Sequence, residues 1–276
     1  MTVAACRSPT PVRGRLQLVF TSGPAGTSLA HAHVSAPLKI VRPFRLSGDR
    51  LLVQVLTLGP GLCAGDHCSL DITVERGARA VVIMQAASRI LGMTEGAEAT
   101  QSVNLAVAAG GQLEYYPGLT IPFADSCFRQ RVTIDADPDS RLGILEHWAM
   151  GRHSRGEYLR FRRLSSRTTV AVAGQPVFAD ALELDTATSE ADHTGILERH
   201  RYVASGFWHG VPDDASIALR SNDVLMAFGR SASPGQIFLR ALTHDGYAMS
   251  GLLQSAIDTI NDAWGCEPIP MRRFVS

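Results

Sequence analysis

Two cysteines, an aspartate and a histidine lie within six positions of the sequence, in the segment Cys63-Ala-Gly-Asp66-His67-Cys68. Four residues separate the cysteines, which is the outer limit for half of a zinc site, and no second ligand pair follows elsewhere. From Cys68 to Val74 apolar and polar residues alternate, which predicts a strand with Cys68 on its inner face and His67 on the other. Because the two side chains point apart, we interpret Cys68 as a small buried side chain rather than a metal ligand.

Other motifs for catalysis or nucleotide binding are weak. His31 and His33 would share one face of a strand and could hold a metal, but the following "VSAPLKI" lacks the glutamate of a cupin-like site, so surface histidines are the better interpretation. The glycine-rich loop from Gly59 to Gly65 precedes a strand instead of a helix, which does not suit phosphate binding. The sequence has no Gly-Lys-Ser/Thr, Gly-x-Ser-x-Gly or His-Glu-x-x-His motif. We therefore expect a protein that is not an enzyme.

An arginine-rich segment raises the alternative of RNA binding. Six arginines fall between Arg152 and Arg167, together with Tyr158 and Phe161. The formal net charge of the chain is zero, however, so no global field attracts nucleic acid. A solvated or protein-facing strand is favoured, and Arg152 is expected to pair with Glu157 across a turn.

Composition narrows the class of protein. The 276 residues are 45% hydrophobic and 19% charged, which is typical of a globular chain. No apolar run is long enough to span a bilayer, and the N-terminus does not resemble a secretory signal. The five cysteines are odd in number and scattered, which argues against a disulfide framework and favours a reducing compartment. We expect a cytoplasmic protein that binds neither membranes nor nucleic acid.

The hydrophobic pattern predicts a mainly β protein of stacked strands, either a sandwich or a β-helix-like coil, with a C-terminal helical segment. Strand–turn–strand units recur about every thirty residues, which suggests stacked hairpins. "GEYLRFRRLSS" and "TTVAVAG" are predicted as separate strands, and "AVVIMQA", apolar throughout, as a strand covered on both faces. Met249 to Trp264 has helical periodicity. We predict a flexible tail over 1–13, one domain over 14–276 and a mobile loop over 185–195.

Five segments in succession resemble the urease accessory protein D family (UreD, called UreH in some organisms). They are "APLKIVRPF", the turn ending at Gly65-Asp66, "QAASRI", "LEYYPGLTIPF" and "EHWAMGRHSRGE". The resemblance covers roughly residues 14–184 well and is thin beyond them. It departs from the family at Ile83-Met84, where a threonine pair is usual, and at Gly61-Leu62, where a glycine pair is usual.

The resemblance implies a non-enzymatic scaffold that binds urease apoprotein, accessory protein F and accessory protein G, a GTPase that brings nickel. It also implies a mostly β fold with a helical coil of strands and two helices near the C-terminal part. A thiolate cage would trap nickel, whereas carboxylates and water release it, so we expect no tightly bound cofactor and at most transient nickel. The alternatives are a β-fold metal-dependent enzyme using His31, His33 and Asp66, or an RNA-binding module.

Glu146, Glu157 and Asp66 are the acids that we assign to a nickel path. Glu146 follows the apolar "LGIL", which places its carboxylate on the inner face of a strand, where it must be paired, coordinated or hydrated. Arg152 is its nearest cation, but Glu157 competes for it. The alternative is that both glutamates simply neutralise the surrounding arginines at the surface. Asp66 is equally suited to bonding the backbone of its own turn.

Overall fold

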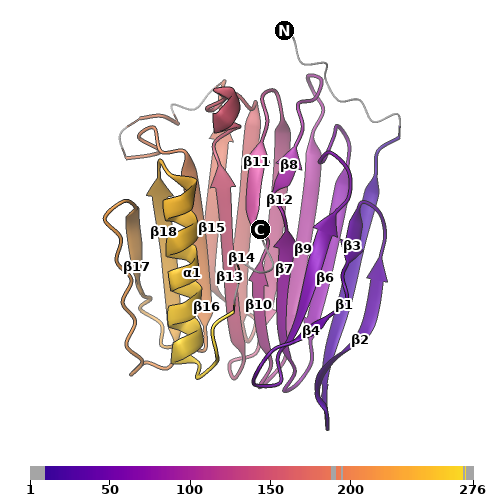
Figure 1. Cartoon of the computed structure of the whole chain (residues 1–276), viewed down its shortest axis with the longest axis vertical. Helices are drawn as coiled ribbons and strands as arrows, with labels where there is room; N and C mark the ends of the chain where they lie inside the picture. The colour runs from indigo at the N-terminus through magenta and orange to yellow at the C-terminus, as the bar shows by residue number, and fades with distance from the viewer. Residues whose placement is uncertain (1–9, 188–190, 194, 270, 272–276) are drawn as a thin grey trace.

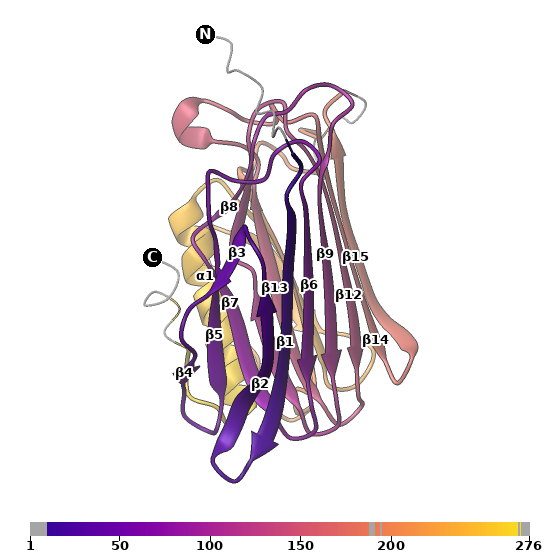
Figure 2. The ribbon, with the colours of Figure 1, turned by 90° about the vertical axis from the view of Figure 1, so that its right-hand side faces the viewer.

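The computed structural model describes residues 10–187, 191–193, 195–269 and 271. These residues form three layers: a seven-stranded sheet, an eleven-stranded sheet and a helix lying on the outer face of the second (Figure 1, Figure 2). Most strands run along the long axis of the molecule (Figure 1). The two sheets face each other (Figure 2). The expected mainly β architecture with a C-terminal helix is confirmed.

We call the seven-stranded sheet sheet A and the eleven-stranded one sheet B. In spatial order sheet A contains β15 (Gln175–Asp185), β14 (Arg163–Val172), β12 (Cys127–Ala136), β9 (Ala99–Val107), β6 (His67–Val74), β1 (Arg13–Gly23) and β2 (Gly26–Val34). The main path of sheet B contains β17 (Leu225–Arg230), β18 (Gln236–Thr243), β16 (Tyr202–His209), β13 (Arg141–Ala149), β10 (Gln112–Tyr116), β7 (Arg79–Gln85), β5 (Leu51–Thr57) and β3 (Leu38–Ile40). Three short strands complete it: β4 (Phe44–Arg45), β8 (Ser88–Ile90) and β11 (Leu119–Pro122).

The repeating units are coils instead of the hairpins that we predicted. Strands β6, β9, β12 and β14 pair in parallel in sheet A, and β7, β10 and β13 pair in parallel in sheet B. Each turn therefore carries the chain from one sheet to the other, as at Gly77, whose φ of 70° suits glycine. The period-2 pattern of each strand is the same in both arrangements, so it did not distinguish them.

Strand β7 explains why a continuous apolar run occurs in this fold. Val82 and Met84 belong to the core between the two sheets, whereas Val81 and Ile83 belong to a second core between sheet B and the helix. The prediction of a strand covered on both faces is confirmed. Sheet A has its inner face in the first core, and the helix covers only sheet B (Figure 2).

Helix α1 (Gly246–Ala263) begins three residues before the periodic pattern does. The Asp245 carboxylate accepts hydrogen bonds from the backbone N–H groups of Tyr247 and Ala248, at 2.6 and 3.4 Å, and so caps the helix. Within the described part of the chain α1 is the one α-helix, accompanied by a 3-10 turn at His153–Arg155, where the family resemblance implied two helices. No helix among the described residues is both long and apolar enough to cross a bilayer.

Two strand predictions need correction. The segment "GEYLRFRRLSS" is a turn as far as Arg162, and its last residues join "TTVAVAG" in the single strand β14. Apolar and charged side chains alternate in this turn as they do in a strand, which is why it was predicted as one. Residues 1–9 of the predicted tail, and 188–190 and 194 of the predicted mobile loop, lie outside the described residues.

A buried ionic network fastens α1 to sheet B. Arg50 donates to Glu114 at 3.2 Å and to the Asn261 side-chain oxygen of α1 at 2.5 Å, and Asn261 donates to Glu114 at 3.0 Å. Tyr116 and Gln112 each donate a further hydrogen bond to the Glu114 carboxylate, at 3.0 Å. Arg50, Glu114 and Asn261 are at most 1% exposed. Removing one charged member therefore leaves the other charge buried without compensation.

Glu114→Gln should destabilise the protein because it leaves the Arg50 guanidinium uncompensated. We expect a loss of about 3 kcal/mol in the free energy of unfolding, measured by urea denaturation at pH 7. The control is Arg129→Gln, which breaks the pair between Arg129 and Glu98 at a side chain that is 57% exposed and should cost less than about 1 kcal/mol. Equal losses in the two variants would contradict the role of the buried network.

Candidate functional site

A line of polar side chains crosses the core between the two sheets, and we call it the interior polar row. Glu146 projects from β13 of sheet B, and its carboxylate accepts hydrogen bonds from the Gln130 amide and, at 2.7 Å, from the Thr168 hydroxyl, both on sheet A. Gln130 also donates to the Ser166 hydroxyl at 3.2 Å and accepts from Gln101 at 3.2 Å. The row thus consists of Gln101, Gln130, Glu146, Ser166 and Thr168.

The alternation of β13 places Glu146 in this position. Leu142, Ile144 and Trp148 belong to the core between the sheets, and Glu146 has the same strand parity. Leu145 and His147 have the opposite parity, toward α1. The predicted inward orientation of Glu146 is confirmed, and its side chain is 6% exposed.

Glu146 has only neutral hydrogen-bond donors. Burial raises the pKa of its carboxyl above the ordinary value, while the hydrogen bonds from Thr168 and Gln130 act in the opposite direction. The Tyr115 hydroxyl is buried without a hydrogen-bond partner among the described residues, and burial and the Glu146 charge both raise its pKa. The core therefore contains a carboxylate that forms no ion pair with a described basic side chain, and an unsatisfied hydroxyl close enough to sense its charge.

Cavities lie on both sides of Glu146. Strand register places Glu146 opposite Ser205, and Ser205 opposite Arg240. Ser205 and Arg240 line a cavity of about 310 Å³ with Asp180, which forms an ion pair with Arg240. In the other direction, Gln130 and Gln101 line a small cavity of about 20 Å³. Glu146 lines neither cavity, but its hydrogen bond from Gln130 and its register opposite Ser205 place it between residues that do.

Glu157 lies in a different environment. It accepts two hydrogen bonds from the Arg152 guanidinium and one from the Ala124 backbone N–H at 3.2 Å. These bonds, chiefly those from Arg152, lower the pKa of Glu157. The predicted pairing across a turn is confirmed, and it leaves Glu146 without that arginine.

Asp66 bonds the backbone of its own turn and of the approaching chain. One carboxylate oxygen accepts from the Val12 N–H at 2.8 Å and the other from the Cys63 N–H at 2.8 Å. The side chain is 5% exposed. The structure does not bring Asp66, Glu146 and Glu157 together into one site.

The described residues contain no cluster of three or more histidine, cysteine, aspartate or glutamate side chains that could hold a metal ion. His31 and His33 are exposed on the edge strand β2. His33 is opposite Gln17 of β1. Gln17 is five residues, or about 17 Å of extended chain, from Val12, which directly precedes β1 and contacts Asp66. The three residues of the enzyme alternative therefore do not converge.

The cysteines of the opening motif do not form a thiolate pair. Burial raises the pKa of the Cys68 thiol to about 11, so it remains protonated near neutral pH. Cys63 is disulfide-bonded, contrary to the inference drawn from the scattered cysteines. Spacing in the sequence did not indicate this bond.

Three of the six arginines between Arg152 and Arg167 have partners within the described chain. Arg152 is paired with Glu157, and Arg163 lies 3.7 Å from Glu183 on the neighbouring strand. Arg162 donates to the backbone carbonyls of Met93 and Thr94, at 3.2 and 2.8 Å. These contacts show that part of the segment is structural.

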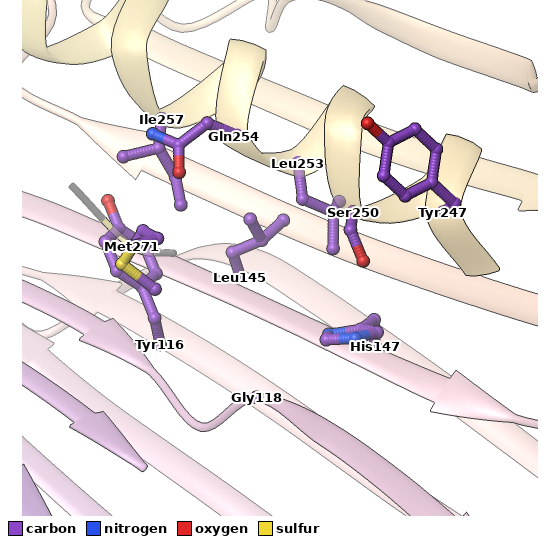
Figure 3. Close-up of a pocket in the computed structure, with 10 residues that line it drawn as sticks. All are labelled: Tyr116, Gly118, Leu145, His147, Tyr247, Ser250, Leu253, Gln254, Ile257 and Met271. Carbon is purple, nitrogen blue, oxygen red and sulfur yellow. The ribbon is translucent and has the colours of Figure 1, made fainter. Parts of the chain in front are cut away.

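An apolar groove of about 430 Å³ lies between α1 and sheet B (Figure 3). Leu145 projects into it from the sheet, with Leu253 and Ile257 from the helix, and Tyr247 stands at one end. His147 lies on its sheet side, where desolvation lowers its pKa to about 4, so the ring is neutral near pH 7. The groove is lined by Tyr116, Gly118, Leu145, His147, Tyr247, Ser250, Leu253, Gln254, Ile257 and Met271, none of them charged at that pH.

The sequence interpretation missed Glu114 and Asp180. Glu114 lies in "QLEYY", an acid within an apolar strand, which is the signal that identified Glu146 in "LGILEHW". Applied consistently, that signal would have found both buried glutamates. The signal would not have shown that only Glu114 has a cationic partner, because that partner, Arg50, lies 64 positions earlier in the sequence.

Comparison with known proteins gives one consistent result. The family model described as UreD urease accessory protein matches residues 12–275. "Urease accessory protein UreD" of Deinococcus radiodurans is 31% identical over 264 residues, covering 94% of each chain. "Urease accessory protein UreD 1" of Synechococcus sp. (strain JA-3-3Ab) is 37% identical over 196 residues, covering 71% of this chain and 73% of that relative.

The two glutamates should respond oppositely to neutralisation. The folded-state pKa of Glu146 is raised, so its ionisation costs stability as the pH rises through that pKa. The folded-state pKa of Glu157 is lowered, so its ionisation adds stability that is lost as the pH falls through that pKa. At pH 7, Glu146→Gln should match or exceed the wild type in the free energy of unfolding, whereas Glu157→Gln should lose about 1 kcal/mol.

Denaturation at several pH values checks this pair of variants. Both differences should shrink toward acid. For Glu146→Gln the change falls between its raised folded-state pKa and the ordinary glutamate pKa of 4.5, and for Glu157→Gln it falls between 4.5 and its lowered folded-state pKa. A Glu146→Gln protein that is much less stable than the wild type at pH 7 would show that the ionised carboxylate is stabilising.

Proposed function

The chain belongs to the UreD urease accessory protein family, and from that premise we propose that it is a scaffold for urease maturation. In this role it binds urease apoprotein, accessory protein F and the GTPase accessory protein G, and it assists the delivery of nickel. The observation that carries the proposal is the family match over nearly the whole chain.

Glu146 is the residue that we assign to nickel passage. A transferring protein needs oxygen ligands that bind a hydrated divalent ion weakly, and an isolated carboxylate meets this need. Glu146 has no competing cation, and hydroxyl and amide oxygens lie along the same row, between two cavities. Glu157 and Asp66 suit this role less well, since Arg152 and two backbone N–H groups respectively occupy their oxygens.

The groove beside α1 is our proposed docking site for accessory protein F. Its uncharged lining and the exposed Tyr247 beside it suit apolar side chains of a partner. The role of scaffold requires at least one such surface, and burial of this groove would also improve the solubility of the protein. Co-expression with accessory protein F should therefore increase its soluble yield.

Glu146→Gln should separate nickel passage from assembly. In a host that co-expresses the urease subunits and accessory proteins, the variant should assemble normally but yield urease with several-fold less nickel and activity. Nickel is measured by mass spectrometry of purified urease. Glu157→Gln is the control, since its partners are structural and it should give nearly full nickel content. Full nickel occupancy with Glu146→Gln would exclude this residue from the path.

Ser250→Arg tests the docking site. Ser250 is an exposed residue of α1 that lines the groove, so a long charged side chain there should block an apolar partner. Binding of accessory protein F should weaken about tenfold or more, measured by calorimetry or by co-purification. Ser255→Arg, at an exposed position of α1 outside the groove lining, should bind normally. Equal binding by the two variants would show that accessory protein F docks on another surface.

A further inference from the structure

The outer face of sheet A is not covered by any described element. Figure 2 shows the two sheets edge-on, with α1 on the far side of sheet B and nothing over the opposite face. The exposed large hydrophobic residues of the described chain are Leu58, Ile196, Leu225, Phe238 and Tyr247, and none belongs to a strand of sheet A. Any partner of this face must therefore be recognised by polar and charged groups.

Arginines gather on one half of this face, near the amino-terminal ends of its parallel strands. All are exposed, and they come from three strands that are distant in sequence. We call the set the arginine face: Arg13 and Arg15 of β1, Arg129 and Arg131 of β12, and Arg163 and Arg167 of β14.

The register of sheet A aligns part of this set in one row across the strands. Arg131 pairs directly with Arg167 on one side and with Ser102 on the other. The row continues through Ser69 to Arg15. Neighbouring positions are about 4.8 Å apart, so Arg15 and Arg131 are separated by about 14 Å, with two serine hydroxyls between them.

Most arginines of the arginine face have no acidic partner within the described chain. Arg129 is paired with Glu98 at 2.5 Å, and Arg163 lies 3.7 Å from Glu183. Arg13, Arg15, Arg131 and Arg167 have no ion pair with a described acidic residue. Like charges directly opposite each other on adjacent strands are destabilising, as at Arg131 and Arg167. Because the whole chain has zero formal net charge, this concentration is a local property of one surface.

We propose that the arginine face docks a protein surface rich in carboxylates. The guanidinium group binds carboxylates through two parallel hydrogen bonds, and the serines between the arginines can donate further ones. The inference rests on the proposed function, because it supplies the maturation scaffold with a second, electrostatic surface on the side opposite the apolar groove.

Acids on the same face favour a protein over a long polyanion. Asp71 and Asp135 lie farther along β6 and β12, four residues beyond His67 and Arg131 respectively. A continuous phosphate backbone needs an uninterrupted basic track, whereas a folded partner can match a mixed pattern of charges.

The test is the double variant Arg131→Thr/Arg167→Thr in the full chain, since threonine is well tolerated in strands. Accessory protein F, accessory protein G and urease apoprotein are each purified and used separately as the probe. Association rates are measured at low and high salt. For at least one probe we expect the variant to associate about tenfold more slowly at low salt, with the difference disappearing as salt increases.

A matched control removes two other exposed arginines. Arg42→Thr/Arg220→Thr causes the same change in net charge away from sheet A, and it should leave the rates unchanged. If the wild type binds a probe and the Arg131/Arg167 variant binds it with the same rate and salt dependence, the inference fails while the scaffold role stands. If the wild type binds none of the three proteins, the scaffold role itself fails. Binding of inorganic polyphosphate that depends on these arginines, with no change for any protein, would also overturn the inference.

Discussion

The Glu114 carboxylate determines how α1 is positioned on sheet B. It lies under α1, where it compensates Arg50 and accepts a hydrogen bond from Asn261 of the helix. Most of the remaining contacts between α1 and sheet B are apolar and do not by themselves specify how the helix is positioned along the sheet. The buried polar contacts do so, because a displaced helix would withdraw the Asn261 amide from Arg50 and Glu114 and leave buried groups without those hydrogen bonds. The groove beside α1 is lined by residues of both the helix and sheet B, so its shape depends on this position.

Glu114 and Glu146 show how two buried carboxylates of one sheet have different environments. They lie on neighbouring strands, β10 and β13, but face opposite layers. Glu114 has four hydrogen-bond donors, one of which is the Arg50 cation. Glu146 has two neutral donors and a raised pKa, so a cation that arrives there gains a ligand without displacing an arginine. This difference is the basis for assigning the first to structure and the second to transport.

Much of the fold could be predicted from local pattern, since the alternation in β6 and β13 and the helical period of α1 depend on near neighbours alone. The order of the strands could not be predicted, because a glycine turn such as the one at Gly77 allows either a hairpin or a crossover between sheets. Site prediction had the same limit. The burial of Glu146 follows from "LGIL", but Arg152, the partner considered for it, pairs with Glu157 instead. Its true partners, Gln130 and Thr168, belong to the opposite sheet and became visible only with the register. The arginine face could not be predicted from the sequence either, because its arginines come from β1, β12 and β14, which are distant in sequence.

The central claim is that urease acquires its nickel with the help of this chain. The most direct measurement is the nickel content of urease produced in a host that expresses the structural subunits and the other accessory proteins, with and without this chain. The account predicts equal amounts of urease apoprotein in both cultures, with nickel and activity low in its absence and restored when it is supplied. Fully nickel-loaded, active urease in the culture without the chain, at the same nickel supply, would contradict the account.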